Sequence, residues 1–255
     1  MSIALKGMKQ AVLSVGAMAM LLSQFWGGSP LAAAEKSSSA SPAVDDSMRA
    51  FEKDAVNRAA ELAKAGNGAG AEAVVAEVRQ RLGDKDPFVD ELSGTVFALQ
   101  KKYAEAEASF RKQLAKAPES RVGQFNLAEM FFLQTRYEEA EKRFASIEST
   151  LRETDPALAD LCRYKRVVCR LALGSSKDAE ALLPSTEDGP ASPAVQYSRA
   201  AIRFAHRDAA GAQKAWEEAR NQFSVDVENL YADSLIELRW GARDESGKFA
   251  FVPVK

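Results

Sequence analysis

Apolar residues recur at three- and four-residue steps along most of the chain after residue 46, beginning with Met48, Phe51 and Ala55. This spacing places apolar side chains on one face of an α-helix. A second segment with the same spacing runs from residue 71 to residue 82, and the glycine-rich stretch GNGAG at 66–70 separates the two. Because glycine favours turns, the pattern predicts a helical hairpin over about 47–82.

A similar eight-residue pattern occurs twice, as YAEAEASF at 103–110 and YEEAEKRF at 137–144. The two copies are 34 residues apart and share Tyr, Ala and Phe at matching places. A fixed period of this size is typical of repeat architectures, in which each helical hairpin stacks on its neighbours.

The period divides the chain into predicted elements. Hairpins are expected at about 47–82, 87–118, 121–150, 157–183 and 193–223, followed by a capping helix at 226–240 and a C-terminal tail at 241–255. Ala179 and Ala212 hold the place of the repeated Ala, and in both of these units we expect an inter-helix turn one residue short. Strand-like alternation occurs only in the tail, KFAFVPVK.

These residues resemble the tetratricopeptide repeat (TPR) family. The first unit matches its pattern at Gly94, Phe97, Tyr103, Ala106, Phe110 and Pro118, and the second at Ala128, Phe131, Tyr137, Ala140 and Phe144. The resemblance covers about 87–223. It implies an all-α protein, an α-solenoid of stacked helix-turn-helix hairpins in which neighbouring units bury a shared apolar face.

The N-terminus has the features of a secretory signal peptide. Lys6 and Lys9 precede an apolar run at 11–26, and Ala32, Ala33 and Ala34 follow a Gly- and Pro-containing stretch. This order predicts cleavage after Ala34, a flexible Ser-rich leader at 35–46, and export to a bacterial periplasm or outside the cell. The alternative is an uncleaved membrane anchor. The later chain has no second long apolar run, so no membrane span is expected after cleavage.

Composition excludes several functions. A net charge of −2 argues against nucleic-acid binding. Cys162 and Cys169 are seven residues apart in one predicted helix, about 10.5 Å along its axis, which is too far for a disulfide. His206 is the only histidine, and no catalytic or metal-binding motif occurs. We therefore expect no cofactor, no metal and no enzyme activity.

One charged pattern stands out. Arg166 and Arg170 are four residues apart on one predicted helix, and Arg199 and Arg203 repeat the pair 33 residues later. Like charges at this spacing destabilise a helix, so a neutralising group is expected nearby. Two alternatives remain open. The arginines pair with acidic residues of this chain, or they form a basic surface on the inner, first-helix side that binds carboxylates of a partner.

The TPR resemblance adds a second set of binding candidates. In that family the inner groove, lined by first helices, often takes an extended peptide. Asn126 matches one position of the family's carboxylate clamp, whereas Glu91 and Thr95 depart from it, and Phe132 can also line the groove. The leading hypothesis is an exported scaffold that binds a protein or peptide. The alternative is a permanent structural subunit of an envelope assembly, or a self-associating solenoid.

Overall fold

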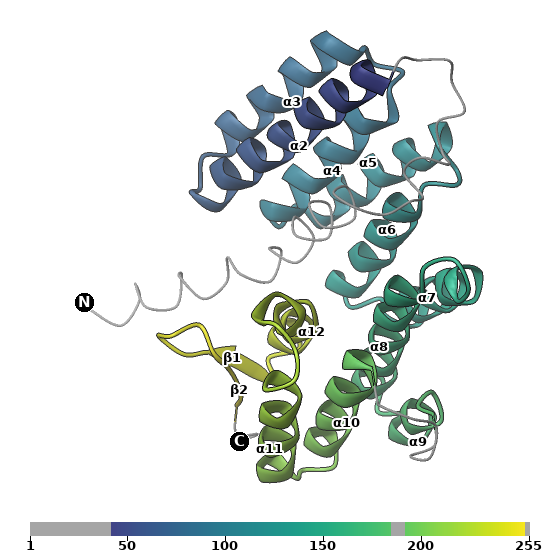
Figure 1. The fold of residues 1–255 in the computed structure, drawn as a ribbon, viewed down its shortest axis with the longest axis vertical. Coiled ribbons are helices and arrows are strands. Elements are labelled where there is room, and N and C mark those ends of the chain that lie inside the picture. The colour runs from purple at the N-terminus through teal and green to yellow at the C-terminus, as the bar shows by residue number, and fades with distance from the viewer. Residues whose placement is uncertain (1–41, 185–191, 253–255) are drawn as a thin grey trace. The chain divides into compact units, whose positions relative to one another are not determined.

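The computed structural model describes residues 42–184 and 192–252 (Figure 1). The predicted signal peptide at 1–34 lies outside the described residues. The described helices are α2 (Pro42–Lys64), α3 (Gly68–Leu82), α4 (Pro87–Leu99), α5 (Tyr103–Lys116), α6 (Arg121–Leu133), α7 (Tyr137–Leu151), α8 (Pro156–Ala172), α9 (Ser176–Glu180), α10 (Pro193–Ala205), α11 (Ala209–Arg220) and α12 (Val225–Glu237). The two strands are β1 (Gly241–Arg243) and β2 (Phe249–Phe251). The predicted all-α solenoid of TPR-like hairpins is confirmed, with one small β-hairpin added to it.

Helix α2 begins at Pro42, within the segment predicted as a flexible leader. Proline is favoured at the first position of a helix, and acidic residues near a helix N-terminus are stabilised by the helix dipole. Asp45 and Asp46 follow Pro42 closely, so the sequence of the leader supports this earlier start.

The chain forms two compact units, and residues 42–130 make the N-terminal one. Its first hairpin, α2 and α3, packs against α4 through a mainly aliphatic core that includes Ala59, Val74 and Leu92, with Phe88 buried among them. In the second hairpin a Cβ added to Gly94 would lie 2.7 Å from the Phe110 ring. The absence of a side chain at Gly94 therefore lets α4 and α5 approach each other closely.

Residues 131–252 make the C-terminal unit, whose core is aromatic. Tyr197 packs against Trp216 at 4.4 Å and against Tyr231 at 4.9 Å between ring centroids. The predicted tail forms an antiparallel hairpin in which Ala242 pairs with Ala250. Phe249 in this hairpin lies 4.3 Å from Trp216 and is 1% exposed. The alternating Phe249 and Phe251 of the tail thus pack into the aromatic core of this unit.

Every hairpin turn has the same geometry. Each contains one residue with positive φ, placed five residues before a fully buried alanine. The pairs are Gly66 and Ala71, Lys101 and Ala106, Thr135 and Ala140, Gly174 and Ala179, and Arg207 and Ala212. The expectation that the last two turns are one residue short was wrong, because the left-handed residue and its backbone hydrogen bonds recur at the same place in all five.

The second helices differ in length. Helix α7 has 15 residues and α9 has 5. The sequence after α9 contains Pro184, Gly189 and Pro190, which do not favour a helix interior. Helix α10 therefore lacks a full-length second helix in the unit before it, at the position where α8 has α7.

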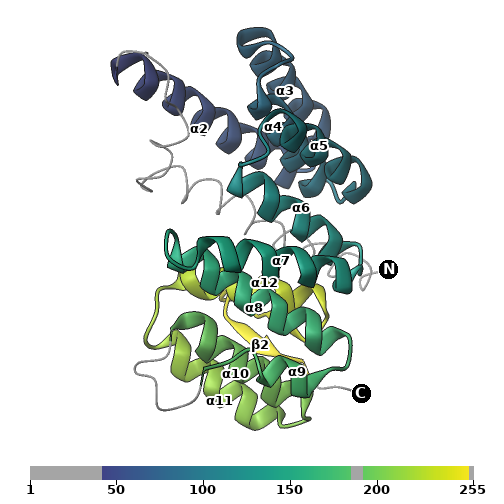
Figure 2. The same ribbon diagram turned by 90° about the vertical axis from the view of Figure 1, so that its right-hand side faces the viewer.

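The last helix does not simply extend the stack. Helix α12 packs against α8 and α10, which are the first helices of two successive hairpins (Figure 2). Tyr231 of α12 lies 4.8 Å from the Tyr164 ring of α8, and the Tyr164 hydroxyl donates a hydrogen bond of 2.5 Å to the Tyr231 carbonyl oxygen. Helix α12 thus covers the surface that these two first helices form.

Candidate functional site

The first arginine pair is held by carboxylates of the neighbouring helix. Arg166 Nε lies 3.1 Å from Glu141 Oε1, and Arg166 Nη1 lies 2.6 Å from Glu148 Oε2. Arg170 Nη2 lies 3.0 Å from Glu141 Oε1. The Glu141 and Glu148 side chains, both on α7, are 12% and 4% exposed. For Arg166 and Arg170, the structure therefore shows the first of the two alternatives, internal pairing.

This pairing changes the electrostatics of α8. Burial of the Arg166 side chain opposes its charge, but the hydrogen bonds that Arg166 donates to Glu148 and Glu141 outweigh burial and raise the pKa of the guanidinium above its ordinary value. Arg163 adds to the same network through Glu148 at 3.1 Å and Asp160 at 3.0 Å. Arg163, Arg166 and Arg170 thus lie in a network of both signs with carboxylates of α7 and α8, which matches internal pairing, one of the two alternatives that the sequence left open.

The second arginine pair has different surroundings. Arg203 on α10 is 56% exposed and lies 3.4 Å from Asp208, whose side chain is 48% exposed. Arg199 is partly exposed, and within the described residues it has no ion-pair or hydrogen-bond partner. Exposed pairs contribute about 0–1 kcal/mol, so the Asp208 contact holds Arg203 only weakly. We call Arg199 and Arg203 the open arginine pair.

The register of the second helices explains this difference. When Ala140 is aligned with Ala179, the matching position to Glu141 is Glu180, the last residue of α9. Glu180 Oε1 lies 3.4 Å from His206 Nε2, so it pairs with the C-terminal end of α10. The position that matches Glu148 lies seven residues further on, outside the described residues. Helix α9 ends at Glu180, and the residue that matches Glu148 is Glu187, of which the structure gives no description.

The groove candidates are buried. Asn126 is 1% exposed, and Phe132 is 2% exposed with its ring 5.4 Å from that of Tyr137. Glu91 and Thr95, where the sequence departs from the family's clamp, are 6% and 1% exposed. These four side chains present almost no surface to a partner in this structure.

The first-helix surface of the C-terminal unit is also closed. Tyr197 of α10 and Tyr231 of α12 stack on each other between these helices, and burial raises the pKa of both hydroxyls. The carboxylate of Glu228 adds to the increase at Tyr197. Glu228 in turn accepts a hydrogen bond of 2.8 Å from Trp216 Nε1. The hydrophobic pattern of 226–240 predicted a helix, but it gave no signal for which surface the helix would cover.

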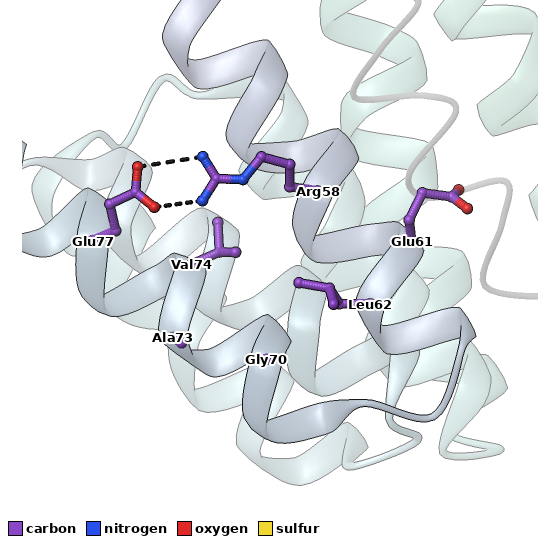
Figure 3. Close-up of a pocket in the computed structure, with 7 residues that line it drawn as sticks. All are labelled: Arg58, Glu61, Leu62, Gly70, Ala73, Val74 and Glu77. Atoms are coloured by element: carbon purple, nitrogen blue, oxygen red, sulfur yellow. Dashed lines mark hydrogen bonds and ion pairs between the residues drawn. The ribbon is translucent and has the colours of Figure 1, made fainter.

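A separate cavity lies in the N-terminal unit, between α2 and α3 (Figure 3). It has a volume of about 520 Å³ and an apolar floor that includes Leu62, Ala73 and Val74. At one side Arg58 forms two hydrogen bonds with Glu77, which lower the pKa of that carboxyl. These two charges neutralise each other, and the remaining charged residue of the lining, Glu61, pairs with Lys64 at 3.2 Å.

The described residues contain no group of three or more His, Cys, Asp or Glu side chains that could hold a metal ion. His206, the only histidine, is 49% exposed and faces Glu180 at a turn. Cys162 and Cys169 are fully buried in α8, where they act as small packing residues. Within 42–184 and 192–252, no helix is long and apolar enough to cross a membrane.

Comparisons with known proteins support the fold. No protein-family model matches the sequence, and a search of curated proteins found no similar sequence. Among solved structures, the chain is similar to a crystallised variant of a Podospora anserina protein described as a kinesin light chain with nearly identical TPR-like repeats. The match has a TM-score of 0.51 and 16% sequence identity, and it covers 68% of this chain and 93% of the other. At this identity the likeness concerns the fold alone, and the fold is TPR-like.

Proposed function

We propose that this protein is an exported scaffold of TPR-like hairpins that holds another protein or peptide in the bacterial envelope. Helical solenoids of this kind present extended surfaces built from repeated side chains, and such surfaces serve binding more often than catalysis. The export part of the proposal is supported by the order of positive, apolar and small residues at 1–34.

The open arginine pair is the observation that carries the proposal. Arg166 and Arg170 are neutralised by α7, whereas the equivalent Arg199 and Arg203 remain at the surface of α10 next to a second helix of only 5 residues. Guanidinium groups at a surface bind carboxylates with two parallel hydrogen bonds. The surface is therefore suited to a partner with acidic side chains or a terminal carboxylate.

Affinity capture from the native envelope fraction tests the proposal. The full chain is compared with a variant that carries Arg199→Gln and Arg203→Gln, and bound proteins are quantified by mass spectrometry. We expect at least one partner to be recovered by the native chain in lower yield with the variant, and its recovery to fall as salt rises. A single partner in equal amount would favour the permanent-subunit alternative over an adaptor. Recovery of no partner under any salt condition would contradict the scaffold proposal.

Export is tested separately by the intact mass of the protein isolated from the export fraction. We expect a chain that begins near Glu35, because three alanines precede it after the apolar run. A chain that retains Met1 would instead support the uncleaved anchor.

A further inference from the structure

We infer that the exposed face of the first hairpin, α2 and α3, is an interface between two copies of this chain, which pack face to face as a four-helix bundle. The inference specifies a surface for the self-associating alternative. It concerns a part of the molecule other than the open arginine pair, and it rests on the proposed export only for the cleavage after Ala34. Its basis is the cleft between α2 and α3 and the side chains that border it (Figure 3).

Two rows of side chains border this cleft, one on each helix. Residues four apart lie on the same face of a helix. The row on α2 consists of Asp54, Arg58 and Leu62. The row on α3 consists of Ala73, Glu77 and Arg81. Leu62 is partly buried and the other five side chains are exposed, whereas the buried sides of α2 and α3 pack against α4.

The contact between Arg58 and Glu77 fixes how the two rows face each other. Arg58 donates hydrogen bonds to both carboxylate oxygens of Glu77, so these two residues lie at the same level of the hairpin. Because the two helices of a hairpin run in opposite directions, a step of four residues along each, about 6 Å, brings Leu62 level with Ala73.

The same step in the other direction brings Asp54 of α2 level with Arg81 of α3. Asp54 also lies 3.2 Å from Arg58 on its own helix, and its side chain is 59% exposed. Each of the three levels therefore holds an unlike pair across the cleft. Two levels hold opposite charges, and one holds a large and a small apolar side chain.

This order makes the face complementary to itself. A twofold axis that runs along the cleft places α2 of one copy across α3 of the other at the same level. Arg58 then meets Glu77 of the second copy, and Asp54 meets its Arg81. Leu62 lies over Ala73 of the second copy, where the small side chain leaves room for it. Twofold dimers use self-complementary surfaces of this kind, and two facing helical hairpins form a four-helix bundle.

The size of the face suits a weak dimer. Helix α3 has 15 residues, about 22 Å, and two helices side by side are about 20 Å wide. Two such faces bury about 900 Å² in total, close to the lower limit of about 1,000 Å² for a specific interface. We therefore expect association at micromolar and not at nanomolar concentration.

Other occupants suit the cleft less well. After cleavage at Ala34, residues 35–41 precede α2, and seven residues extend over at most about 25 Å. Leu62 lies about 20 residues beyond Pro42, about 30 Å along α2, so this segment is too short to fill the cleft. An unrelated protein would have to reproduce the same order of charge and size, which a second copy already has.

Sedimentation velocity of the chain that begins at Glu35 tests the inference, over concentrations from about 5 to about 200 μM. We expect a reversible change from monomer to dimer. Ala73→Arg puts a long charged side chain where Leu62 of the second copy should pack, so it should weaken dimerisation at least about tenfold. The matched control Ala108→Arg makes the same change at an exposed position of α5 and should alter dimerisation less than about twofold.

Two charge variants test the contact between copies directly. Arg58→Glu and Glu77→Arg each bring like charges together in a dimer of the variant with itself, so each variant alone should be mainly monomeric. A mixture of the two variants restores opposite charges at both contacts between the copies, and heterodimers should form. Since each chain in the mixture still lacks its internal pair, this recovery reports on the contact between copies and not on folding.

Three results would overturn the inference. These are a monomer over the whole concentration range, equal dimerisation of the Ala73→Arg and Ala108→Arg chains, or no preference for heterodimers in the mixture. Circular dichroism of each variant should show unchanged helix content. None of these variants alters Arg199 or Arg203, so a monomeric chain would leave the scaffold proposal, which affinity capture tests, standing.

Discussion

Equivalent arginines have different surroundings in this protein, because the side chains near them differ. Arg166 has a side chain that is 18% exposed and lies between two carboxylates, whereas Arg203 is 56% exposed with a single weak contact. Removing one member of a buried ion network leaves the others desolvated and unpaired. Removing an exposed charge has little effect on folding.

Arg166→Gln should therefore lower the free energy of unfolding by about 1–3 kcal/mol, less than the loss for a fully buried pair because some solvent reaches the side chain. Arg199→Gln, the matched change on α10, should stay within about 0.5 kcal/mol of the native value. Urea denaturation followed by tryptophan fluorescence compares the two. Equal losses for both variants would mean that Arg199 is also held internally.

Gly94 sets the approach of α4 and α5, since a Cβ there would lie 2.7 Å from Phe110. Gly94→Leu should cost at least about 1–3 kcal/mol of unfolding free energy through overpacking. Ala76→Leu serves as its control, because Ala76 is an exposed position of α3 and leucine is a good helix former. A Gly94→Leu protein as stable as the control would show that the helix pair separates at little cost.

At the scale of elements, α12 decides which surface of the C-terminal unit is available. It covers α8 and α10 through Tyr231, while the β-hairpin covers Trp216 with Phe249. In the part of the chain that the structure describes, these rings are packed on several sides, so α12 covers the faces of α8 and α10 that carry Tyr164 and Tyr197. Helix α9 has 5 residues against the 15 of α7, so among the described residues α10 has a shorter second helix beside it than α8 has.

The packing of α12 predicts a dependence of stability on pH. Burial raises the pKa of Tyr197 and Tyr231 in the folded chain above the unfolded value of about 10. Their neutral form is favoured by folding, so this contribution is fully present below about pH 10 and is lost as pH rises above it. Urea denaturation at pH 8, 10 and 11 should show a decline only above pH 10.

A double variant with Tyr197→Phe and Tyr231→Phe keeps both rings and removes both ionisable hydroxyls. Its unfolding free energy should decline less between pH 10 and pH 11 than that of the native chain. The same decline in both proteins would assign the effect to other groups, such as lysines.

At the scale of the whole molecule, the two units have separate cores: the first is mainly aliphatic with Phe88 buried in it, and the second contains a cluster of aromatic rings. Solenoid repeats interact mainly with their nearest neighbours, so damage should remain local. Hydrogen exchange measured by mass spectrometry should therefore show faster exchange in α4 and α5 after Gly94→Leu than in α10 and α11. Uniformly faster exchange would mean that the chain unfolds as one cooperative unit.

The sequence by itself determined the repeat. Tyr103, Ala106 and Phe110 recur at 137, 140 and 144 because each hairpin must offer its neighbour the same packing surface, and that requirement is local and periodic. The two arginine pairs were visible for the same reason. The buried alanine was readable in this way in four hairpins, down to the degenerate units around Ala179 and Ala212, whereas Ala71 of the first hairpin was visible only as part of the helical periodicity.

Only the tertiary structure decided which arginine pair is covered and which surface is closed. The arginine pair on α8 is covered because α7 is long enough to bring Glu148 to Arg166. The surface of the first helices is closed by a contact between Tyr164 and Tyr231, which are 67 residues apart in the chain. Helical periodicity shows which face of a helix is apolar, but not which element will bury it. Which element buries that face depends on how all the apolar faces of the chain pack together. This is a property of the whole fold and cannot be read from one segment.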